Sequence, residues 1–386
     1  MFRQDTTFVI GAGASYEFGL PVGSELARRI KKSALIKNPD ARDPIYGDEF
    51  FYRTFKRLYP GDHSEHEAAL EALDTIHKGM HTAVSIDAFI HRFRKDLMIA
   101  RMGKMLIALE IIKAENESKL ERDRWAQLTE ISGKVKVPPP DDVWIGQFLR
   151  ILLDGITDPQ DIGREVNIIC FNYDRCIEHY LSLSIAAAFR LSPAEAHEIV
   201  ERMNIIHPYG TLGELAMMEA VAGNDGKLPF AAPLSIIPRL EDIAKNIRTY
   251  TEQTHDPETV EKIHRAMANN VVLVFLGFGF NNQNLDLLRV KGLPGDYRVT
   301  PRNIYATGVG IASQVEGTIE RRVYNLFVDG YKHEFWKGRM HTEFGLSCSD
   351  LLNRHNLNFT SFTERYVTGV GEPTLISSTD DFDNQP

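Results

Sequence analysis

A short glycine-rich segment near the N-terminus has the composition of a phosphate-binding turn. It reads GAGAS at residues 11–15 and directly follows the β-branched and aromatic run TTFVI at 6–10. Glycines let a backbone approach a pyrophosphate closely, and the helix after such a turn offers unpaired N–H groups. The dinucleotide-binding pattern is incomplete, because Tyr16 stands where a third glycine is expected. A tight strand–helix turn without a ligand explains this segment equally well.

A second polar segment, FNYD at 171–174, follows an almost wholly apolar run. An asparagine at a strand end can hydrogen-bond a ribose hydroxyl or hold a water molecule, and Asp174 can orient it. The alternative is a structural role, in which Asn172 or Asp174 caps the helix that we expect from about Arg175. Taken by itself, this segment favours the cap.

A histidine provides the third group with possible chemistry. His207 begins the segment HPYG at 207–210, after a short apolar run. An imidazole has a pKa near neutrality, which makes it a natural general base. In a chain with 13 histidines, a single histidine beside Pro208 and Gly210 is more typical of an ordinary turn.

The elements that carry these segments favour an α/β fold. Helical patterns separate five predicted strands, at residues 6–10, 166–171, 204–206, 271–276 and 304–308. This alternation predicts a doubly wound, Rossmann-like parallel sheet, in which ligands bind beyond the carboxyl ends of the strands. The unusual polar and glycine residues fall at those ends, which predicts one composite site: Gly11, Asn172, His207, Gly277 and Thr307.

A long segment between the first two predicted strands has apolar residues at helical spacing. Ser85 suits an N-cap and Asp87 suits the positive end of the helix dipole, so we predict a helix from residue 85 to about 115. The predicted organisation is a core at 1–36 and 165–330, a mainly helical insertion at 37–164, and a C-terminal extension at 331–386. We expect the acidic tail of that extension to be disordered.

Composition excludes several classes of protein. The chain has 386 residues, a net charge of −9 and 43% hydrophobic residues, which disfavours a dedicated naked-DNA binder. Its three cysteines, Cys170, Cys176 and Cys348, exclude a disulfide framework and a four-cysteine zinc module. Neither a signal peptide nor an apolar run long enough for a bilayer is present, so we expect a cytoplasmic protein without membrane insertion.

The segment after the glycine turn disfavours a dehydrogenase. Such an enzyme needs a second strand that ends in an acidic residue about 20 residues further on. Here that distance falls at Lys31, Lys32 and Ser33, inside a helical pattern.

In their order and spacing, these segments resemble the sirtuin-like family. The resemblance covers GAGAS at 11–15 with GLP at 19–21, SIDAF at 85–89, FNYD at 171–174, HPYG at 207–210, GFGF at 277–280 and IYATG at 304–308. Protein deacylases of the family carry a four-cysteine zinc module, which this chain lacks. The sequence looks more like the bacterial antiphage-defence branch, and FLGFGF followed by NNQNL at 281–285 is similar to members that pair with a HerA-type hexameric ATPase.

This resemblance implies an enzyme that cleaves NAD, as its substrate, to nicotinamide and ADP-ribose without zinc. It implies a pyrophosphate cradle of Gly11, Ala12, Gly13 and Ser15, and an adenosine side lined by Gly277, Gly279, Thr307 and Gly308. It also implies that Asn172 positions water, that Asp174 supports it and that His207 is the base. In the family the histidine directly precedes the glycine, whereas here Tyr209 holds that place and His207 lies two residues earlier.

Further expectations concern partners and competing functions. The resemblance implies a homo-oligomer and a HerA-type ATPase partner, with nucleic acid reached only through that partner and no membrane. One alternative is a sensor that binds NAD or ADP-ribose without cleaving it. A protein ADP-ribosyltransferase or deacylase is disfavoured by the missing zinc module, and a nuclease subunit by the lack of a convincing metal-binding carboxylate cluster.

Overall fold

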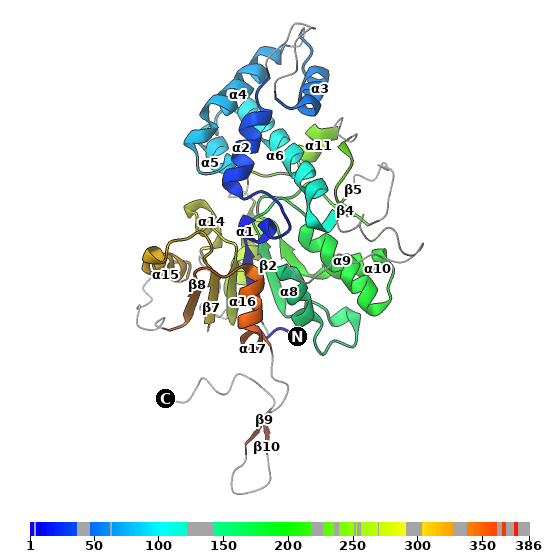
Figure 1. Cartoon of the computed structure of the whole chain (residues 1–386), viewed down its shortest axis with the longest axis vertical. Coiled ribbons are helices and arrows are strands. Elements are labelled where there is room, and N and C mark those ends of the chain that lie inside the picture. The colour runs from blue at the N-terminus through cyan, green and yellow to red at the C-terminus, as the bar shows by residue number, and fades with distance from the viewer. Residues whose placement is uncertain are drawn as a thin grey trace.

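A computed structural model describes most of the chain as an α/β fold with a parallel central sheet (Figure 1). The described residues are 1–3, 5–36, 47–61, 64–121, 143–217, 227–234, 239–250, 252, 256–268, 270–290, 303–327 and 338–360, with the backbone of 365–367 and 374–376. Helices cover both faces of the sheet, and a further group of helices lies beyond one of its ends. The predicted fold class is therefore confirmed.

Six parallel strands form the central sheet in the order β3-β2-β1-β6-β7-β8. They are β1 (Thr6–Ile10), β2 (Val166–Cys170), β3 (Asn204–Ile206), β6 (Val272–Leu276), β7 (Asn303–Thr307) and β8 (Met340–Glu343). Along the chain this is the order 3-2-1-4-5-6 of doubly wound dinucleotide-binding sheets. The strand order reverses between β1 and β6, so a crevice opens there at the carboxyl ends.

The five predicted strands are all present, with nearly the predicted bounds. The sixth, β8, was not predicted, because the short sequence MHTE lacks an apolar run and lies at the edge of the sheet. Part of the segment after residue 331 therefore completes the sheet. The acidic tail predicted to be disordered lies outside the described residues.

The central strands β1 and β6 are buried on both faces, which explains their apolar sequences. On one face, Phe8 and Ile10 pack in the cluster of α8 (Trp144–Leu153), α9 (Cys176–Phe189) and α16 (Cys348–Arg354). On the other, Val9 packs in the cluster of α13 (Pro257–Ala268), α14 (Asn282–Leu288) and α15 (Glu316–Tyr324). The ends of β1 and β6, at residues 10 and 276, are therefore fixed by packing on both faces in the middle of the sheet.

A group of helices beyond the carboxyl ends of the strands, called the helical lobe here, packs around one long helix. It consists of α2 (Gly23–Ser33), α3 (Glu49–Leu58), α4 (His66–Gly79), α5 (Ile86–Arg92), α6 (Leu97–Glu117) and α11 (Leu240–Ala244). Buried residues occur along the length of α6, which forms the centre of the lobe. Within the described ranges, no helix combines the length and the apolar character needed to cross a bilayer.

The remaining described elements are short. They are α1 (Ala12–Tyr16), α10 (Pro193–Arg202), α17 (Asn356–Phe359), the pair β4 (Leu215–Ala216) and β5 (Leu228–Pro229), the pair β9 (Arg365–Val367) and β10 (Thr374–Ile376), and the 3₁₀ turns Met80–Thr82, Pro159–Asp161 and Ser313–Val315.

The helix predicted from residue 85 to about 115 is in fact two helices, α5 and α6. Ser85 caps α5 as expected, since its Oγ accepts a hydrogen bond from the Ala88 amide at 3.1 Å. A second cap then starts α6: Asp96 Oδ1 accepts from the amides of Met98 and Ile99 at 3.0 and 3.1 Å. Such a cap favours a new helix start over a continuous helix. The break makes α5 an element separate from α6, and the N-terminal end of α5 lies at the cavity beside the sheet.

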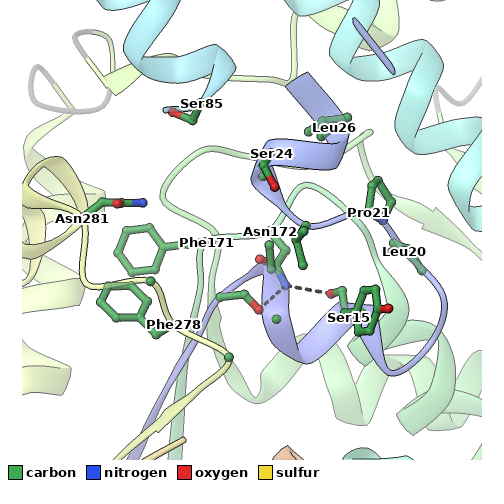
Figure 2. A pocket seen from close by; sticks show the side chains of 18 of the residues that line it. Ser15, Leu20, Pro21, Ser24, Leu26, Ser85, Phe171, Asn172, Phe278 and Asn281 are labelled. Carbon is green, nitrogen blue, oxygen red and sulfur yellow. Dashed lines mark hydrogen bonds between the residues drawn. The ribbon is translucent and has the colours of Figure 1, made fainter. Parts of the chain in front are cut away.

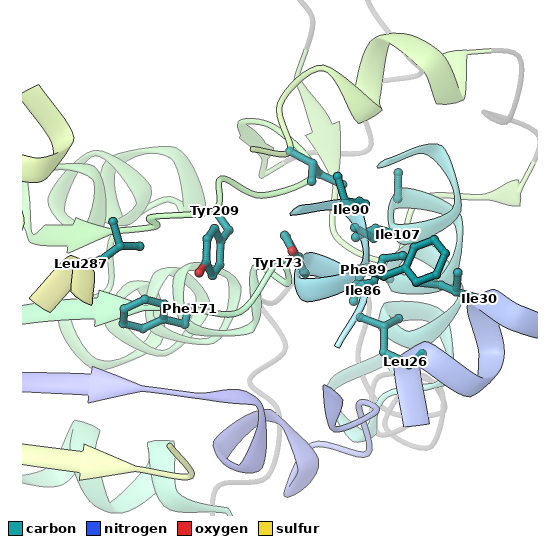
Figure 3. Packing of buried hydrophobic residues seen from close by; sticks show 14 of the residues in the cluster. Leu26, Ile30, Ile86, Phe89, Ile90, Ile107, Phe171, Tyr173, Tyr209 and Leu287 are labelled. Atoms are coloured by element: carbon teal, nitrogen blue, oxygen red, sulfur yellow. The ribbon is translucent and has the colours of Figure 1, made fainter. Parts of the chain in front are cut away.

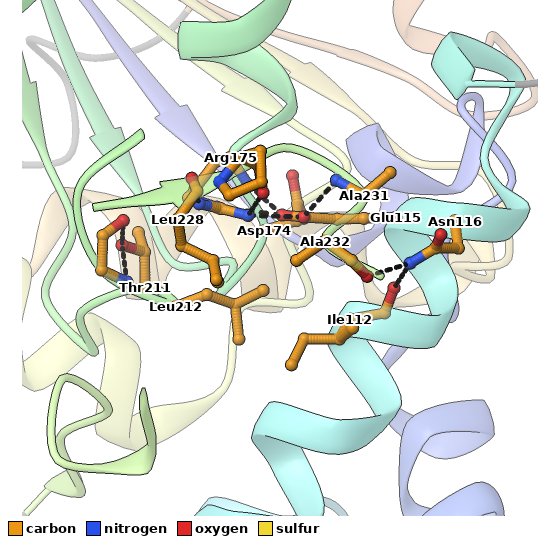
Figure 4. A network of polar contacts seen from close by, with 12 residues as sticks. Ile112, Glu115, Asn116, Asp174, Arg175, Thr211, Leu212, Leu228, Ala231 and Ala232 are labelled. Carbon is orange, nitrogen blue, oxygen red and sulfur yellow. Dashed lines mark hydrogen bonds and ion pairs between the residues drawn. The ribbon is translucent and has the colours of Figure 1, made fainter. Parts of the chain in front are cut away.

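A buried ion pair joins the helical lobe to the sheet-bearing core (Figure 4). Glu115, near the end of α6, is 0% exposed and lies 2.7 Å from Arg175 Nη2 at the start of α9. Arg175 also donates to the Leu228 carbonyl at 2.7 Å, and Glu115 accepts from the Ala231 amide at 3.1 Å. Because each charge is compensated, the pair fixes three chain segments to one another.

Candidate functional site

A cavity of about 1020 Å³ lies at the carboxyl ends of the strands, between the sheet and the helical lobe (Figure 2). Its walls come from the turn after β1, the start of α5, the segment 171–174 after β2, and the turns after β6 and β7. This is the crevice at the reversal of strand order, where doubly wound sheets bind their ligands. Cavities for small molecules are typically about 300–1,000 Å³, so this one has room for a large ligand.

Most of the residues predicted for the site line this cavity. They are Gly11, Ala12, Gly13, Ser15, Asn172, Asp174, Gly277, Gly279 and Thr307. Gly308 does not line it, because this residue packs against Phe344, whose ring a Cβ at 308 would meet at 2.8 Å. His207 does not line it either. The structure therefore brings nine of the predicted residues together around one cavity and leaves His207 and Gly308 outside its wall.

The glycines of the turn are explained by packing alone. A Cβ at Gly11 would lie 2.6 Å from the Gly277 carbonyl oxygen, and the Gly13 amide donates to that oxygen at 3.0 Å. Gly277 has a φ of +57°, and its amide donates to Thr307 Oγ1 at 2.7 Å. The two strand-end turns thus touch each other, with or without a ligand. Tyr16 needs no glycine in its place, because its side chain extends into solvent, 65% exposed.

Three polar side chains form a network at the cavity wall. Asn172 Nδ2 donates to Ser15 Oγ at 2.7 Å and to the Gly11 carbonyl at 3.1 Å, as the dashed lines in Figure 2 show. Ser15 Oγ donates in turn to Asp174 Oδ2 at 2.8 Å. Both amide hydrogens of Asn172 are therefore used by the fold. Its Oδ1 accepts no hydrogen bond from any described residue, so this oxygen is oriented and available to a hydroxyl or a water.

The helix-capping alternative applies to Asp174 and not to Asn172. Asp174 Oδ1 accepts from the amide of Cys176, the first residue of α9, at 3.2 Å. Burial raises the pKa of Asp174, and the hydrogen bonds from Ser15 and Cys176 oppose that shift. With both carboxylate oxygens occupied, Asp174 serves as a support for Ser15 and for the helix.

His207 faces away from the cavity and forms a closed pair. Its Nδ1 lies 3.1 Å from the Asn172 carbonyl oxygen, and its Nε2 lies 2.7 Å from Glu178 Oε1. Because both partners are acceptors, the ring donates from both nitrogens and is an imidazolium. Burial lowers the pKa of His207, but the Glu178 carboxylate outweighs it and holds that pKa well above its ordinary value. The geometry therefore does not support His207 as a base toward a ligand in the cavity.

Tyr209 takes the place on the cavity wall that the resemblance gives to a histidine. It is buried, it precedes Gly210, and its hydroxyl donates to Asn284 Oδ1 at 2.8 Å. Burial raises the pKa of its phenol far above the ordinary value of 10. A phenol of this kind stays protonated at neutral pH, so Tyr209 shapes the wall without accepting a proton.

Asp87 and Tyr173, which had no predicted role in the site, meet on the cavity wall nearest the helical lobe. The Tyr173 hydroxyl donates to Asp87 Oδ1, and both residues line the cavity. Figure 3 shows Tyr173 between Tyr209 and Ile86, the first residue of α5. Burial raises the pKa of Asp87 to about 6, and the bond from Tyr173 opposes the shift. In the sequence, Asp87 is explained by the helix dipole at the start of α5. No local pattern indicates its contact with Tyr173.

The other charged residues on the wall have structural or peripheral places. Glu17 Oε2 accepts from the amide of Trp144 at 2.8 Å and Oε1 from that of Cys348 at 2.7 Å, so this carboxylate holds the starts of α8 and α16. Lys119 is exposed, and it is the one lysine or arginine among the described residues that line the cavity. It is the side chain on this wall best suited to a phosphate.

No family model, no curated protein and no solved structure matches this chain. A functional proposal for it therefore depends on the cavity itself and on the residues that line it.

Proposed function

We propose that the protein binds NAD in this cavity and hydrolyses it to nicotinamide and ADP-ribose. The observation that carries the proposal is the Asn172 amide, which Ser15 and Gly11 hold at a strand end with its oxygen unused. An acceptor fixed in this way can orient a ribose hydroxyl or a water next to the bond that breaks.

The position and the walls of the cavity support a dinucleotide as the ligand. The strand order and the crevice between β1 and β6 are those of dinucleotide-binding sheets. Phe171 and Phe278, with ring centroids 5.4 Å apart and planes tilted by 54°, both line the cavity and add apolar aromatic surface against which a planar ring can pack. Gln283 and Asn284 lie on the same side and offer amide groups that pair with a carboxamide.

One observation favours a second function, a sensor that binds NAD or ADP-ribose without cleavage. The histidine expected to act as base faces away from the cavity, and Tyr209 in its place cannot accept a proton at neutral pH. A sensor needs the cavity but not a base. The two functions differ in whether nicotinamide is released.

The test measures binding and cleavage on the same preparation. NAD binding is followed by calorimetry, and nicotinamide and ADP-ribose by chromatography after incubation. Asn172→Ala is expected to lower the rate of nicotinamide release at least about a hundredfold while the protein stays folded. The matched control is Asn204→Ala on β3, which removes an exposed amide that bonds Asn167 at 2.6 Å far from the cavity wall, and which should keep the wild-type rate.

The outcomes separate the candidates. Binding without nicotinamide release in the wild-type protein establishes the sensor and rejects the hydrolase. Absence of binding rejects both. Full turnover in Asn172→Ala removes the observation on which the hydrolase proposal rests.

The resemblance extends this proposal to the biological setting. We propose that NAD depletion serves antiphage defence, and that the chain forms a homo-oligomer with a HerA-type ATPase partner. Light scattering of the purified chain tests for the homo-oligomer, and a monomer with full activity at micromolar concentration contradicts it. Co-purification with the ATPase tests for the partner.

A further inference from the structure

We infer that Asp87, held in place by the Tyr173 hydroxyl, is the general base of the cavity and takes a proton from the attacking water. This inference rests on the proposed NAD hydrolysis and names the residue that the geometry leaves for the role.

The position of Asp87 combines two parts of the molecule. It lies in the first turn of α5 in the helical lobe, whereas its hydrogen-bond donor Tyr173 stands between Asn172 and Asp174 at the end of β2. The oriented amide and the carboxylate therefore belong to adjacent walls of one cavity. Each of the two walls thus offers an acceptor to a water molecule in the cavity, and the carboxylate is the acceptor that can take its proton.

The other acidic groups of the wall are occupied. Glu17 accepts backbone amides at the starts of α8 and α16. Asp174 accepts from Ser15 and Cys176. By contrast, Tyr173 is the one other described residue that donates a hydrogen bond to the Asp87 carboxylate. Asp87 therefore retains acceptor capacity on the cavity side.

The surroundings of Asp87 suit a base near neutral pH. No cation is among the groups that shift its pKa, and burial raises that pKa to about 6. The titratable groups that face it are the phenols of Tyr173 and Tyr209, which burial keeps protonated by raising their own pKa values. An acid with a pKa close to the working pH is an effective proton acceptor, because it is ionised and still basic.

The proposed step is balanced in atoms and electrons. The bond between the ribose C1′ and the nicotinamide nitrogen breaks, and nicotinamide leaves as a neutral molecule with the bonding electron pair. The water oxygen forms the new bond to C1′, and its proton passes to the Asp87 carboxylate. Asp87 then returns the proton to solvent, so NAD and water give ADP-ribose, nicotinamide and one proton.

The experiment compares full-length wild type, Asp87→Asn and Tyr173→Phe, with Asp74→Asn as control. Asp74 is an exposed carboxylate on α4 that pairs with Lys78, away from the cavity. Asp87→Asn is expected to lower kcat at least about a hundredfold and to change the Kd for NAD only a few-fold. The control should keep both values.

The pH dependence of the rate distinguishes a base from a residue with only a structural role, because a structural residue would not shift the acid limb. The wild-type rate is expected to fall as pH drops through about 6, because the base becomes protonated. A histidine base would give a limb in the same range, so the variants decide between them. Tyr173→Phe removes a bond that stabilises the ionised carboxylate, and the limb should therefore move to higher pH. A further variant, Asp87→Ala, removes the carboxylate, and added formate should restore part of its rate.

Each result supports or overturns a defined statement. Wild-type turnover retained in a folded Asp87→Asn protein overturns the inference and leaves NAD hydrolysis standing. An unmoved acid limb in Tyr173→Phe overturns the positioning by Tyr173. If the wild-type protein binds NAD and releases no nicotinamide, the proposed function fails first, and the role of Asp87 fails with it.

Discussion

Two polar regions lie beside the strand-end segment 171–174, one on the cavity wall and one outside it, and their charged groups are partnered in different ways. Outside the cavity wall, His207 pairs with Glu178, and Arg175 pairs with Glu115. On the cavity side, Asp87 has a phenol and no cation beside it, and the Asn172 oxygen has no partner among the described residues. The paired region joins the elements of the fold. The cavity region keeps acceptors open in a place where water and a ligand can reach them.

The difference shows that burial alone does not mark a functional group. Removing one partner of a buried ion pair costs about 3–5 kcal/mol, so such pairs hold a structure together even where they contribute little net stability. A buried carboxylate without a cation destabilises the fold when it is ionised, and it needs another reason to be there. This criterion is the reason that we assign the proposed function to the cavity side, although the region outside it contains the more conspicuous histidine.

The strongest test of the paired region is Glu115→Gln. This change leaves the Arg175 guanidinium buried without its counter-charge, and we expect the free energy of unfolding to fall by about 3–5 kcal/mol. Denaturant unfolding measures it. The control is Glu117→Gln, an exposed residue of the same helix, which should change stability by less than about 0.5 kcal/mol. Equal effects of the two substitutions would mean that the buried pair does not join the lobe to the core.

A second test uses the stability cost of Asp87. Its pKa is about 6 in the folded protein and near 3.8 unfolded, so its contribution to stability falls as pH rises from about 4 to about 6 and then stays level. Asp87→Asn should therefore be more stable than wild type at pH 7.5, by up to about 3 kcal/mol, and nearly equal to it at pH 4. Thermal melts at the two pH values check this. A variant less stable than wild type at pH 7.5 would place Asp87 with the structural residues.

The smallest expected effect concerns His207→Gln. The pKa of His207 is raised in the folded protein, so its contribution is complete below pH 6.5 and is lost as pH rises through the folded value. We expect a loss of about 1–3 kcal/mol at pH 6, which shrinks at alkaline pH. Nicotinamide release should stay within a few-fold of wild type, because His207 does not line the cavity. A decrease of about a hundredfold in the rate of nicotinamide release by a folded variant would identify His207 as the base and contradict the distinction between the two regions.

Much of this arrangement could be predicted from sequence, because it depends on local patterns. The apolar run of β6 and the glycine turn after β1 identify strands and their carboxyl ends, and a parallel sheet brings those ends together. Asn172 and Gly277 were found in this way, whereas Ser15 was assigned to the site through the resemblance. The edge strand β8 escaped, since its four residues carry no periodic apolar signal.

The unpredicted part depends on contacts between distant segments. Residue 87 meets residue 173 because tertiary packing brings the start of α5 to the end of β2. The predicted long helix stops at Arg92, and Asp96 begins a new one. The orientation of His207 depends on Glu178, in the first turn of α9. Neither contact has a signature in spacing or composition, and both are set by tertiary packing.

The ion pair between Glu115 and Arg175 acquires a kinetic meaning if the cavity carries out chemistry. The oriented amide is fixed to the sheet and the carboxylate to the helical lobe, so the rate depends on how those two bodies are held. A misplacement of about 1 Å between reacting groups lowers a rate roughly a hundredfold. We therefore expect that a force applied to the outer helices, far from any ligand, slows the proposed reaction by straining this buried pair, with every group in the cavity still intact.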